Sequence, residues 1–436
     1  MASAGRLWQH RAGTGEREAC LHEHPLRRQI VGEMHLRRWP AVAAPATIVQ
    51  MLRQVAPEQR AAEAAHLAQV AAALPEGARH AMGQLAPGLA YVWERHAEAS
   101  GITLFAQEGA DPAAGLAWLA GFPGAVVRAT RIRVVSGEAQ VAAALAGAGF
   151  LASDLVSCGI GPEGCRLWSD FRIGADGFGQ LVVDVPEAPA QAAARQGHDV
   201  ARLLQTLQDL GNYRNLALLG LPLARAHWPR LDGVEEALRQ LAGDVGRADL
   251  TDDALLEKVC AISLELMSIG AETRYRLSAT RAYARLVEER LGQLAVRPIA
   301  GYPSLEDFTH RRFLPAVRTC SAFDRRLGEL TARGAQFTAL LRTRVETRIE
   351  NQNGQLLRSM EQSASLQLRL QQLVEGLSVV ALSYYALALV GYVLKGVEEV
   401  APHFPAVAAE GALVPVVVAC VWLGLHRMKA RLLGGH

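Results

Sequence analysis

One stretch near the C-terminus restricts the folds open to this chain more than any other feature. Residues 376–394 carry no charged side chain. As an α-helix they would be about 28 Å long, close to the thickness of the hydrocarbon core of a bilayer. Uncharged runs of this length are rare in soluble domains. We therefore expect a transmembrane helix here, with a buried hairpin in a soluble core as the alternative.

A second apolar segment runs from Gly411 to Leu425. It extends backwards through residues 406–409 if Glu410 lies at the membrane interface. Pro415 does not exclude a helix, because a proline near a helix start loses little hydrogen bonding and transmembrane helices tolerate prolines. The two segments together predict a transmembrane hairpin, and hence a multi-pass protein whose first partner is the lipid bilayer.

The charges that flank this hairpin predict its orientation. Arg358 and Arg369 precede the first segment, and Arg427, Lys429 and Arg431 follow the second. The connecting loop has no comparable excess of basic residues. Because basic residues accumulate on the cytoplasmic side of a membrane protein, both termini should be cytoplasmic.

Upstream of the hairpin, residues 335–374 contain one glycine and no proline. Apolar positions such as Leu341, Val345 and Ile349 recur at helical spacing, while the other faces carry charged and amide side chains. This pattern predicts a long helix that continues towards the membrane. Two interpretations are open, because the pattern is not a sustained heptad repeat. The helix is either a stalk that self-associates into a homo-oligomer or an amphipathic helix that covers its own domain.

The N-terminal part of the chain has the pattern of an α+β domain. Strand-like runs cover residues 125–135, 165–173 and 180–185, and residues 138–148 look helical. The last two strands are separated by the pair Asp176-Gly177, which is typical of a tight hairpin turn and requires a positive φ at the glycine. We therefore expect a small antiparallel sheet with helices.

The expected organisation has seven parts, from the N-terminus to the C-terminus. They are an α+β cytoplasmic domain (1–190), a helical region (191–334), a long stalk helix (335–374), a first transmembrane helix (375–395), an external loop (396–405), a second transmembrane helix (406–426) and a basic cytoplasmic tail (427–436).

Composition and motifs exclude several classes of function. The formal net charge is only +2, so no nucleic acid is expected as a partner. Six cysteines without a Cys-x-x-Cys pair indicate a reducing compartment for the soluble part. There is no Walker loop, Rossmann fingerprint or nucleophile elbow. An enzyme is therefore the less favoured hypothesis. The sequence identifies no cofactor, and a divalent cation is the candidate that we consider.

Three groups of polar residues are candidate sites. His24, Glu33 and His35 carry metal-binding groups, but their spacing matches no established zinc signature. A cytoplasmic pocket is predicted if two further groups converge, although a histidine such as His96 on a helix is more often part of a surface ion pair. These two groups are Trp93, Glu94, Arg95 and His96, and Asp170 with Arg172.

Short strings of a recognisable kind run along nearly the whole chain. They include His24-Pro-Leu-Arg27, Trp93-Glu-Arg-His96, Asp170-Phe-Arg172, Tyr213-Arg214, Ser278-Ala-Thr-Arg-Ala-Tyr283, Arg342-Thr-Arg-Val-Glu346, Gln367-Leu-Arg-Leu-Gln371 and Val374-Glu-Gly-Leu-Ser-Val379. Jointly they resemble an uncharacterised bacterial family of predicted membrane-anchored proteins, the domain of unknown function 3422. Gly211 and Ser363 depart from the family pattern, which has an acidic and a basic residue there. The resemblance implies anchoring in the bacterial inner membrane and no established activity.

The layout of the chain is also similar to that of CorA-type divalent-cation channels. Both have an α/β cytoplasmic domain, a long helix, two closely spaced transmembrane helices and a short basic tail. The Gly-Met-Asn signature of that family is absent after the first span, where Gly391-Tyr392-Val393 is no substitute. A likeness of architecture alone does not assign a function.

The first predicted span carries a polar stripe. Ser378, Tyr385 and Tyr392 recur at seven-residue intervals and share one helix face, with Glu375 at its cytoplasmic end. The stripe either packs against the second helix of the same hairpin or faces other copies around a common axis. In the second case a narrow pore with a ring of carboxylates is conceivable.

Two classes of function follow from these patterns. The first is a membrane-anchored, self-assembling protein, with CorA-like ion transport as an extension. The second is a membrane-tethered enzyme or ligand-binding module whose site lies in the N-terminal α+β domain.

Overall fold

The computed structural model describes residues 24–34, 38–71, 78–161, 164–187, 189, 192–247, 249–400 and 405–433. The chain divides into two compact units. The first unit consists of Met1–Gln240 and Ala261–Arg333, and the second of Leu241–Cys260 and Gly334–His436. We describe each unit by itself.

The first unit is built on a sheet of nine strands in the order β2-β3-β4-β1-β5-β8-β7-β6-β9. β5 and β8 are parallel, whereas the other neighbours are antiparallel. The strands are β1 (Ala46–Gln54), β2 (His80–Ala86), β3 (Leu89–Arg95), β4 (Ser100–Gln107), β5 (Ala125–Val135), β6 (Val156–Ile160), β7 (Cys165–Ser169), β8 (Gly179–Asp184) and β9 (Arg297–Pro298).

The small antiparallel sheet predicted from the sequence is therefore a larger, mixed sheet. β5 and the helix α4 (Glu138–Ala148) have the predicted bounds. The four strands before β5 were not predicted, and β4 shows why: its residues are buried from Ser100 to Ala106. A strand that is buried on both faces lacks the alternation of apolar and polar residues that identifies a half-exposed strand.

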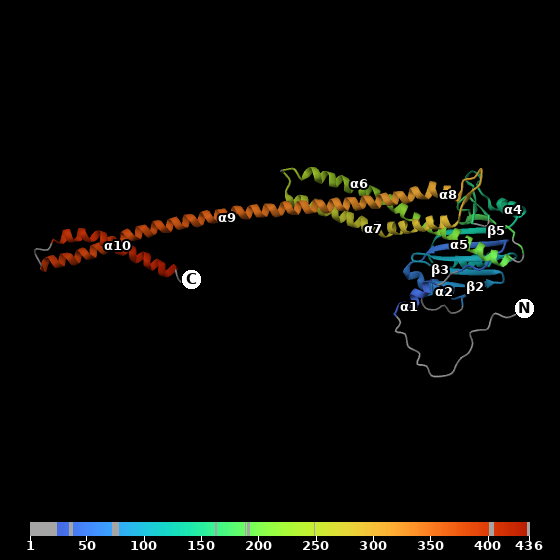
Figure 1. Ribbon diagram of the computed structural model, residues 1–436, viewed down its shortest axis with the longest axis horizontal. Coiled ribbons are helices and arrows are strands. Elements are labelled where there is room, and N and C mark those ends of the chain that lie inside the picture. The colour runs from blue at the N-terminus through green and yellow to red at the C-terminus, as the bar shows by residue number, and fades with distance from the viewer. Residues whose placement is uncertain are drawn as a thin grey trace, which may run out of the picture. The chain divides into compact units, whose positions relative to one another are not determined.

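Helices cover both faces of the sheet (Figure 1). On one face α5 (Ala193–Leu218) packs Leu204 and Leu207 onto the core that contains Ile132 and Val183. The other face is covered by α2 (Arg60–Leu67), α3 (Ala113–Ala120) and α4. Because successive side chains of a strand point to opposite faces, β5 contributes Val134 to the first core and Val135 to the second.

The connection between β7 and β8 has the predicted turn. Gly177 has φ = 81°, so the positive φ expected of the Asp176-Gly177 pair is confirmed. The strand before it is shorter than predicted, because β7 ends at Ser169 and Ile173 makes only an isolated bridge to Gly179. The residues between Ser169 and Ile173 are consequently free of the ladder and form a loop beside the start of β8.

The remaining elements of the first unit are mainly helical. Three helices, α6 (Gly220–Asp244), α7 (Asp252–Gln293) and the start of α9 (Leu314–Val400), are joined by ion pairs and by the ring contact between Trp228 and Phe323. The shorter elements are α1 (Arg27–Glu33), α8 (Leu305–Phe308), the 3-10 turns Pro57–Gln59 and Ala152–Asp154, and a π-helical turn at Thr309–Phe313.

The second unit consists largely of α9 and α10 (Ala406–Leu433). The long helix begins at Leu314, well before the predicted residue 335, and continues without a break to Val400. At a rise of 1.5 Å per residue it is about 130 Å long. Within this unit Arg344 and Arg348 both pair with the carboxylate of Asp252, at 3.0 and 2.9 Å, which ties α9 to the first turn of α7.

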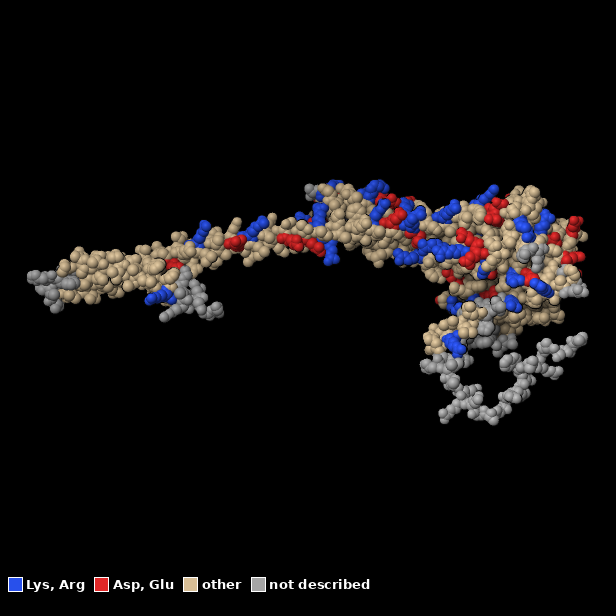
Figure 2. Space-filling model, viewed as in Figure 1, with Lys and Arg blue, Asp and Glu red and all other residues tan. Residues whose placement is uncertain are grey.

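The ends of α9 and α10 form an apolar hairpin. Both helices are long and apolar enough to cross a membrane, judged by length and composition. Few charged side chains are visible on the hairpin in Figure 2, in contrast to the rest of the surface. The two helices meet at Gly391, where an added Cβ atom would lie 2.7 Å from Oε1 of Glu410. Most of their apolar side chains are exposed in the chain alone.

Candidate functional site

The candidate site lies in the first unit, at the point where β8 begins. β5 pairs with β1 along its whole length, but its parallel partner β8 starts only at Gly179, opposite Thr130. Residues 126–129 therefore have an open edge, and Nδ2 of Asn215 donates to the carbonyl of Val127 there, at 3.3 Å. The result is a cavity of about 410 Å³ between β5, the loop after β7 and α5. We call it the arginine pocket, because Arg128, Arg172 and Arg214 line it.

Arg128 enters this pocket from the sheet and is only 8% exposed. Its Nη1 donates to side-chain oxygens of Gln50, Gln208 and Asn212, at 3.2, 2.6 and 3.0 Å. The space for the guanidinium exists because residue 211 is a glycine: a Cβ atom there would lie 2.5 Å from Cζ of Arg128. Nη2 and Nε of Arg128 have no hydrogen-bond partner among the residues that the structure describes.

Arg214 enters from α5 and lies beside a stacked pair of aromatic rings, Phe171 and Phe308, whose centres are 4.4 Å apart. Its Cζ is 4.9 Å from the ring centre of Phe171 and 5.4 Å from that of Phe308. Phe171 has an unfavourable positive φ of 52°, in a loop where its N–H donates to Oγ of Ser169. The Nη1 group of Arg214 is buried and has no hydrogen-bond partner within the described part of the chain. Cation–π contacts stabilise a guanidinium but leave its N–H groups unsatisfied.

Both arginines lie in an unfavourable electrostatic environment. Burial, and after it the positive charge of Arg214, lower the pKa of Arg128 to about 9, although the carboxylate of Asp209 opposes both effects. Burial also lowers the pKa of Arg214 to about 10. Within the described ranges no carboxylate forms an ion pair with either guanidinium. The pocket is therefore positively charged at neutral pH and is suited to bind an anion.

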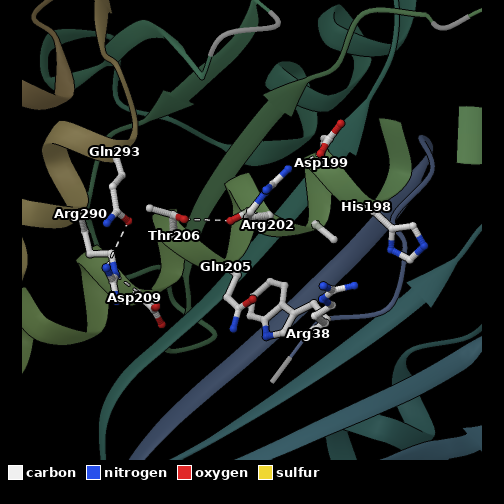
Figure 3. Close-up of a pocket in the computed structure, with 11 residues that line it drawn as sticks. Arg38, His198, Asp199, Arg202, Gln205, Thr206, Asp209, Arg290 and Gln293 are labelled. Atoms are coloured by element: carbon white, nitrogen blue, oxygen red, sulfur yellow. Dashed lines mark hydrogen bonds and ion pairs between the residues drawn. The ribbon is translucent and has the colours of Figure 1, made fainter. Parts of the chain in front are cut away.

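A second cavity of about 700 Å³ lies along α5, beside the C-terminal end of α7. Figure 3 shows Arg38, His198 and Arg202 around it, together with Asp209 and Arg290. The carboxylate of Asp209 is 3.5 Å from Nε of Arg290, and Nη1 of Arg290 donates to Gln293 at 3.1 Å. Burial raises the pKa of Asp209 to about 6, although Arg290 and Arg128 both lower it. Asp209 thus stabilises the positive charges of Arg128 and Arg290, but its ion pair is with Arg290.

The structure places the residues of the predicted cytoplasmic pocket at separate positions on the sheet. Trp93, Glu94 and Arg95 end strand β3 and do not lie on a helix, and His96 lies in the turn that follows. Trp93 is 1% exposed, and Glu63 accepts hydrogen bonds from its Nε1 and from Nη2 of Arg95, at 3.0 and 3.2 Å. These side chains therefore attach α2 to the sheet.

Asp170 and Arg172 lie far from that group in the sheet, because β4, β1, β5 and β8 separate β3 from β7. Asp170 accepts from the N–H groups of Leu151 and Arg172, which is loop chemistry. Arg172 donates to Asp154 at 2.6 Å and also lines the arginine pocket. Of the predicted pocket residues, the structure places Arg172 beside the site.

The proposed metal ligands are only partly described. Nδ1 of the exposed His24 accepts from the N–H of Leu26 at 3.2 Å, and Glu33 is the last residue of α1. His35 lies outside the described residues. In the part of the chain that the structure covers, no three His, Cys, Asp or Glu side chains are grouped as a metal site would require.

In the polar stripe of the first predicted span, the two tyrosines are exposed, whereas Glu375 and Ser378 are half-buried. Tyr385 and Tyr392 are 67% and 76% exposed, whereas Ser383 and Gly391 are buried in the hairpin. The hydroxyl of Ser378 donates to the carbonyl of Val374 in its own helix, at 2.8 Å. The two tyrosines are therefore not the residues through which α9 contacts α10 in one chain.

Sequence reasoning missed Arg128 and Arg214, although a signal for the first was present. In β5 the residues Arg128, Thr130, Ile132 and Val134 share one face by their alternation, so an arginine stands in line with core residues. Gln208 and Asn212 are one turn apart on the face of α5 that packs on the sheet. For Arg214, no pattern in the sequence predicts that Phe171 and Phe308 would stack beside it.

Comparisons with known proteins add a family and no activity. No curated protein and no solved structure matches the chain. One family model, described as a protein of unknown function (DUF3422), matches residues 22–432. This match includes the sheet, the arginine pocket and both helices of the hairpin. The chain therefore belongs to the family of proteins of unknown function DUF3422.

Proposed function

We propose that this protein is anchored in the bacterial inner membrane by the α9–α10 hairpin and that it self-associates there. The observation that carries the proposal is the exposure of the hairpin. Its two helices bury little of their apolar surface against each other, and large side chains such as Leu377, Tyr384 and Leu389 remain exposed. An apolar surface of this extent in one chain is typical of a segment that meets lipid or another subunit.

The contact between the helices supports a membrane hairpin of defined geometry. On α10, the residues that are partly covered recur every four positions, at Leu413, Val417, Val421 and Leu425. They form one narrow seam along the helix. The remaining faces are available to lipid. The basic residues that flank the hairpin support an arrangement with both termini in the cytoplasm.

Self-association is supported by two surfaces that α10 leaves uncovered. One is the stripe with Tyr385 and Tyr392. The other is the part of α9 before the span, where Leu356, Met360 and Leu370 are exposed. Helices in proteins are stabilised mainly by packing of their apolar faces, so a second copy of the same helix is the partner we propose.

Cysteine cross-linking tests the assembly. In a background without native cysteines, single cysteines at positions 385 and 392 should form disulfides between subunits in native membranes. A cysteine in place of Val380, which is also exposed but lies off the stripe, is the matched control and should not. Absence of cross-linking at both stripe positions contradicts the proposed interface. Ion flux in liposomes that decreases in Glu375→Gln would extend the function to ion transport.

A further inference from the structure

We propose that the arginine pocket binds the phosphate group of a small phosphomonoester. This inference goes beyond membrane anchoring and self-association and does not depend on either. It follows from the charge of the pocket, from the hydrogen-bond donors that the protein leaves unused there, and from the size of the cavity.

The first step concerns charge. Arg128 and Arg214 remain protonated at neutral pH, because their lowered pKa values of about 9 and about 10 still lie above it. Burying two like charges without a counter-charge is unfavourable. Asp209 is the acidic group that acts on Arg128, and it is paired with Arg290. A dianionic ligand group would supply the missing negative charge, whereas a single carboxylate would supply half of it.

The second step concerns donors. Arg128 uses Nη1 for all three of its bonds to the protein, so Nη2 and Nε remain for a ligand. Arg214 makes ring contacts but no hydrogen bond to any residue that the structure describes. Guanidinium groups offer pairs of parallel N–H donors that match two oxygens of a phosphate. Two such groups at one cavity match a tetrahedral oxyanion.

The third step concerns size. The cavity of about 410 Å³ is larger than an inorganic phosphate requires and falls within the range of small-molecule pockets, about 300–1,000 Å³. Beside the arginines it is lined by the neutral polar residues Thr130, Ser169 and Asn215 and by apolar residues that include Phe171 and Ile173. This mixed lining suits a short organic group attached to the phosphate.

The test uses the full chain purified in detergent. Binding of inorganic phosphate and of glycerol phosphate is measured by calorimetry, with sodium chloride at the same ionic strength as the control for screening. Wild-type protein should bind glycerol phosphate more tightly than inorganic phosphate. Arg214→Met, which keeps the apolar part of the side chain but removes the guanidinium, should weaken binding by about 10- to 100-fold. The matched control Arg325→Met removes an arginine that is 73% exposed on the surface of α9 and should bind as wild type does.

Thermal stability separates this role from a merely structural one. If the role of Arg214 is to bind an anion, Arg214→Met should melt at the same temperature as wild type, or a higher one, when phosphate is absent. When phosphate is added, the melting temperature of the variant should not rise as that of wild type does. Gly211→Asp is a second variant: its Cβ atom takes the space of the Arg128 guanidinium and its carboxylate competes for that charge, so it too should abolish the response to phosphate.

Vesicles with and without phosphatidic acid identify the source of the phosphate group. Binding of the soluble ester assigns a free metabolite, and binding of the lipid alone assigns a lipid headgroup at the same arginines. No binding of either by wild-type protein overturns the proposal. Equal binding by wild type and Arg214→Met also overturns it.

Discussion

Among single residues, Glu63 shows how a charged side chain can be essential to the fold without belonging to a site. It is 1% exposed and accepts hydrogen bonds from the indole of Trp93 and the guanidinium of Arg95. The sequence places Trp93 and Arg95 in a polar string that looks functional. The structure instead makes them the partners of a buried carboxylate, which holds α2 against the sheet.

Replacing Glu63 with alanine should therefore reduce the free energy of unfolding by about 3 kcal/mol, because it leaves buried donors on Trp93 and Arg95 without an acceptor. Urea unfolding followed by tryptophan fluorescence measures the change. Glu58→Ala, which removes an exposed carboxylate just before α2, is the control and should cost less than about 0.5 kcal/mol. Equal losses in the two variants would show that the bonds to Trp93 and Arg95 contribute nothing.

Asp209 should make stability depend on pH. Burial raises its pKa from 3.8 to about 6, so between these values the folded protein binds more protons than the unfolded chain. The stability that this proton provides is complete below the unfolded pKa and is lost as pH rises through the folded pKa. The variant Asp209→Asn has no carboxyl group to titrate, so its stability should not fall over this pH range. Relative to wild type, the variant should gain up to about 3 kcal/mol between about pH 4 and pH 7.

Asp154 should affect the pH dependence of stability with the opposite sign. The hydrogen bond from Arg172 lowers the pKa of Asp154, so ionised Asp154 favours the folded state. Relative to wild type, Asp154→Asn should lose stability as pH rises through the acidic range, which is opposite to Asp209→Asn. Urea unfolding at a series of pH values measures both. A difference between wild type and Asp209→Asn that is constant with pH would contradict the assignment of the raised pKa.

At the scale of elements, the hairpin depends on one close approach. Gly391 of α9 faces Glu410 of α10 so closely that an added Cβ atom would lie 2.7 Å from the carboxylate. Gly391→Leu should push the helices apart near the loop. Spin labels at the exposed positions 380 and 416 should then report a longer and broader distance distribution. Gly396→Leu is the control, since a Cβ atom at Gly396 meets nothing within 4 Å. An unchanged distribution in Gly391→Leu would mean that the helices do not meet there.

Elements differed in how well their sequence predicts them. β5, α4 and the turn at Gly177 follow from local patterns, because alternation, helical composition and an Asp-Gly pair each act within a few residues. β4 escaped prediction since burial on both faces removes the alternation. The arginine pocket could not be predicted either, because it needs α5 to bring Arg214 to Phe171 and Phe308, which both lie far from it in the sequence.

For the whole molecule, the family to which the chain belongs has no known function. We therefore infer its function from how the chain is organised. One unit carries a mixed sheet with a positively charged pocket, and the other carries a long helix that ends in an apolar hairpin. The sequence alone predicts the hairpin, because a charge-free run longer than a typical core helix is compatible with few structures other than a membrane span. Which surfaces of the hairpin remain uncovered required the structure, since that depends on the angular position of Ser383 and Gly391 under α10.

The central claim, that the hairpin lies in a membrane, can be tested directly with two native thiols. Cys260 on α7 and Cys420 on α10 are both exposed in the isolated chain, whereas Cys158, Cys165 and Cys320 are buried. With Cys20 replaced by serine, a membrane-impermeant maleimide is added to open membrane fragments. Cys260 should react rapidly, and Cys420 should react only after denaturation in detergent, because lipid covers it. Reaction of Cys420 at the rate of Cys260 in the intact fragments would contradict the membrane hairpin.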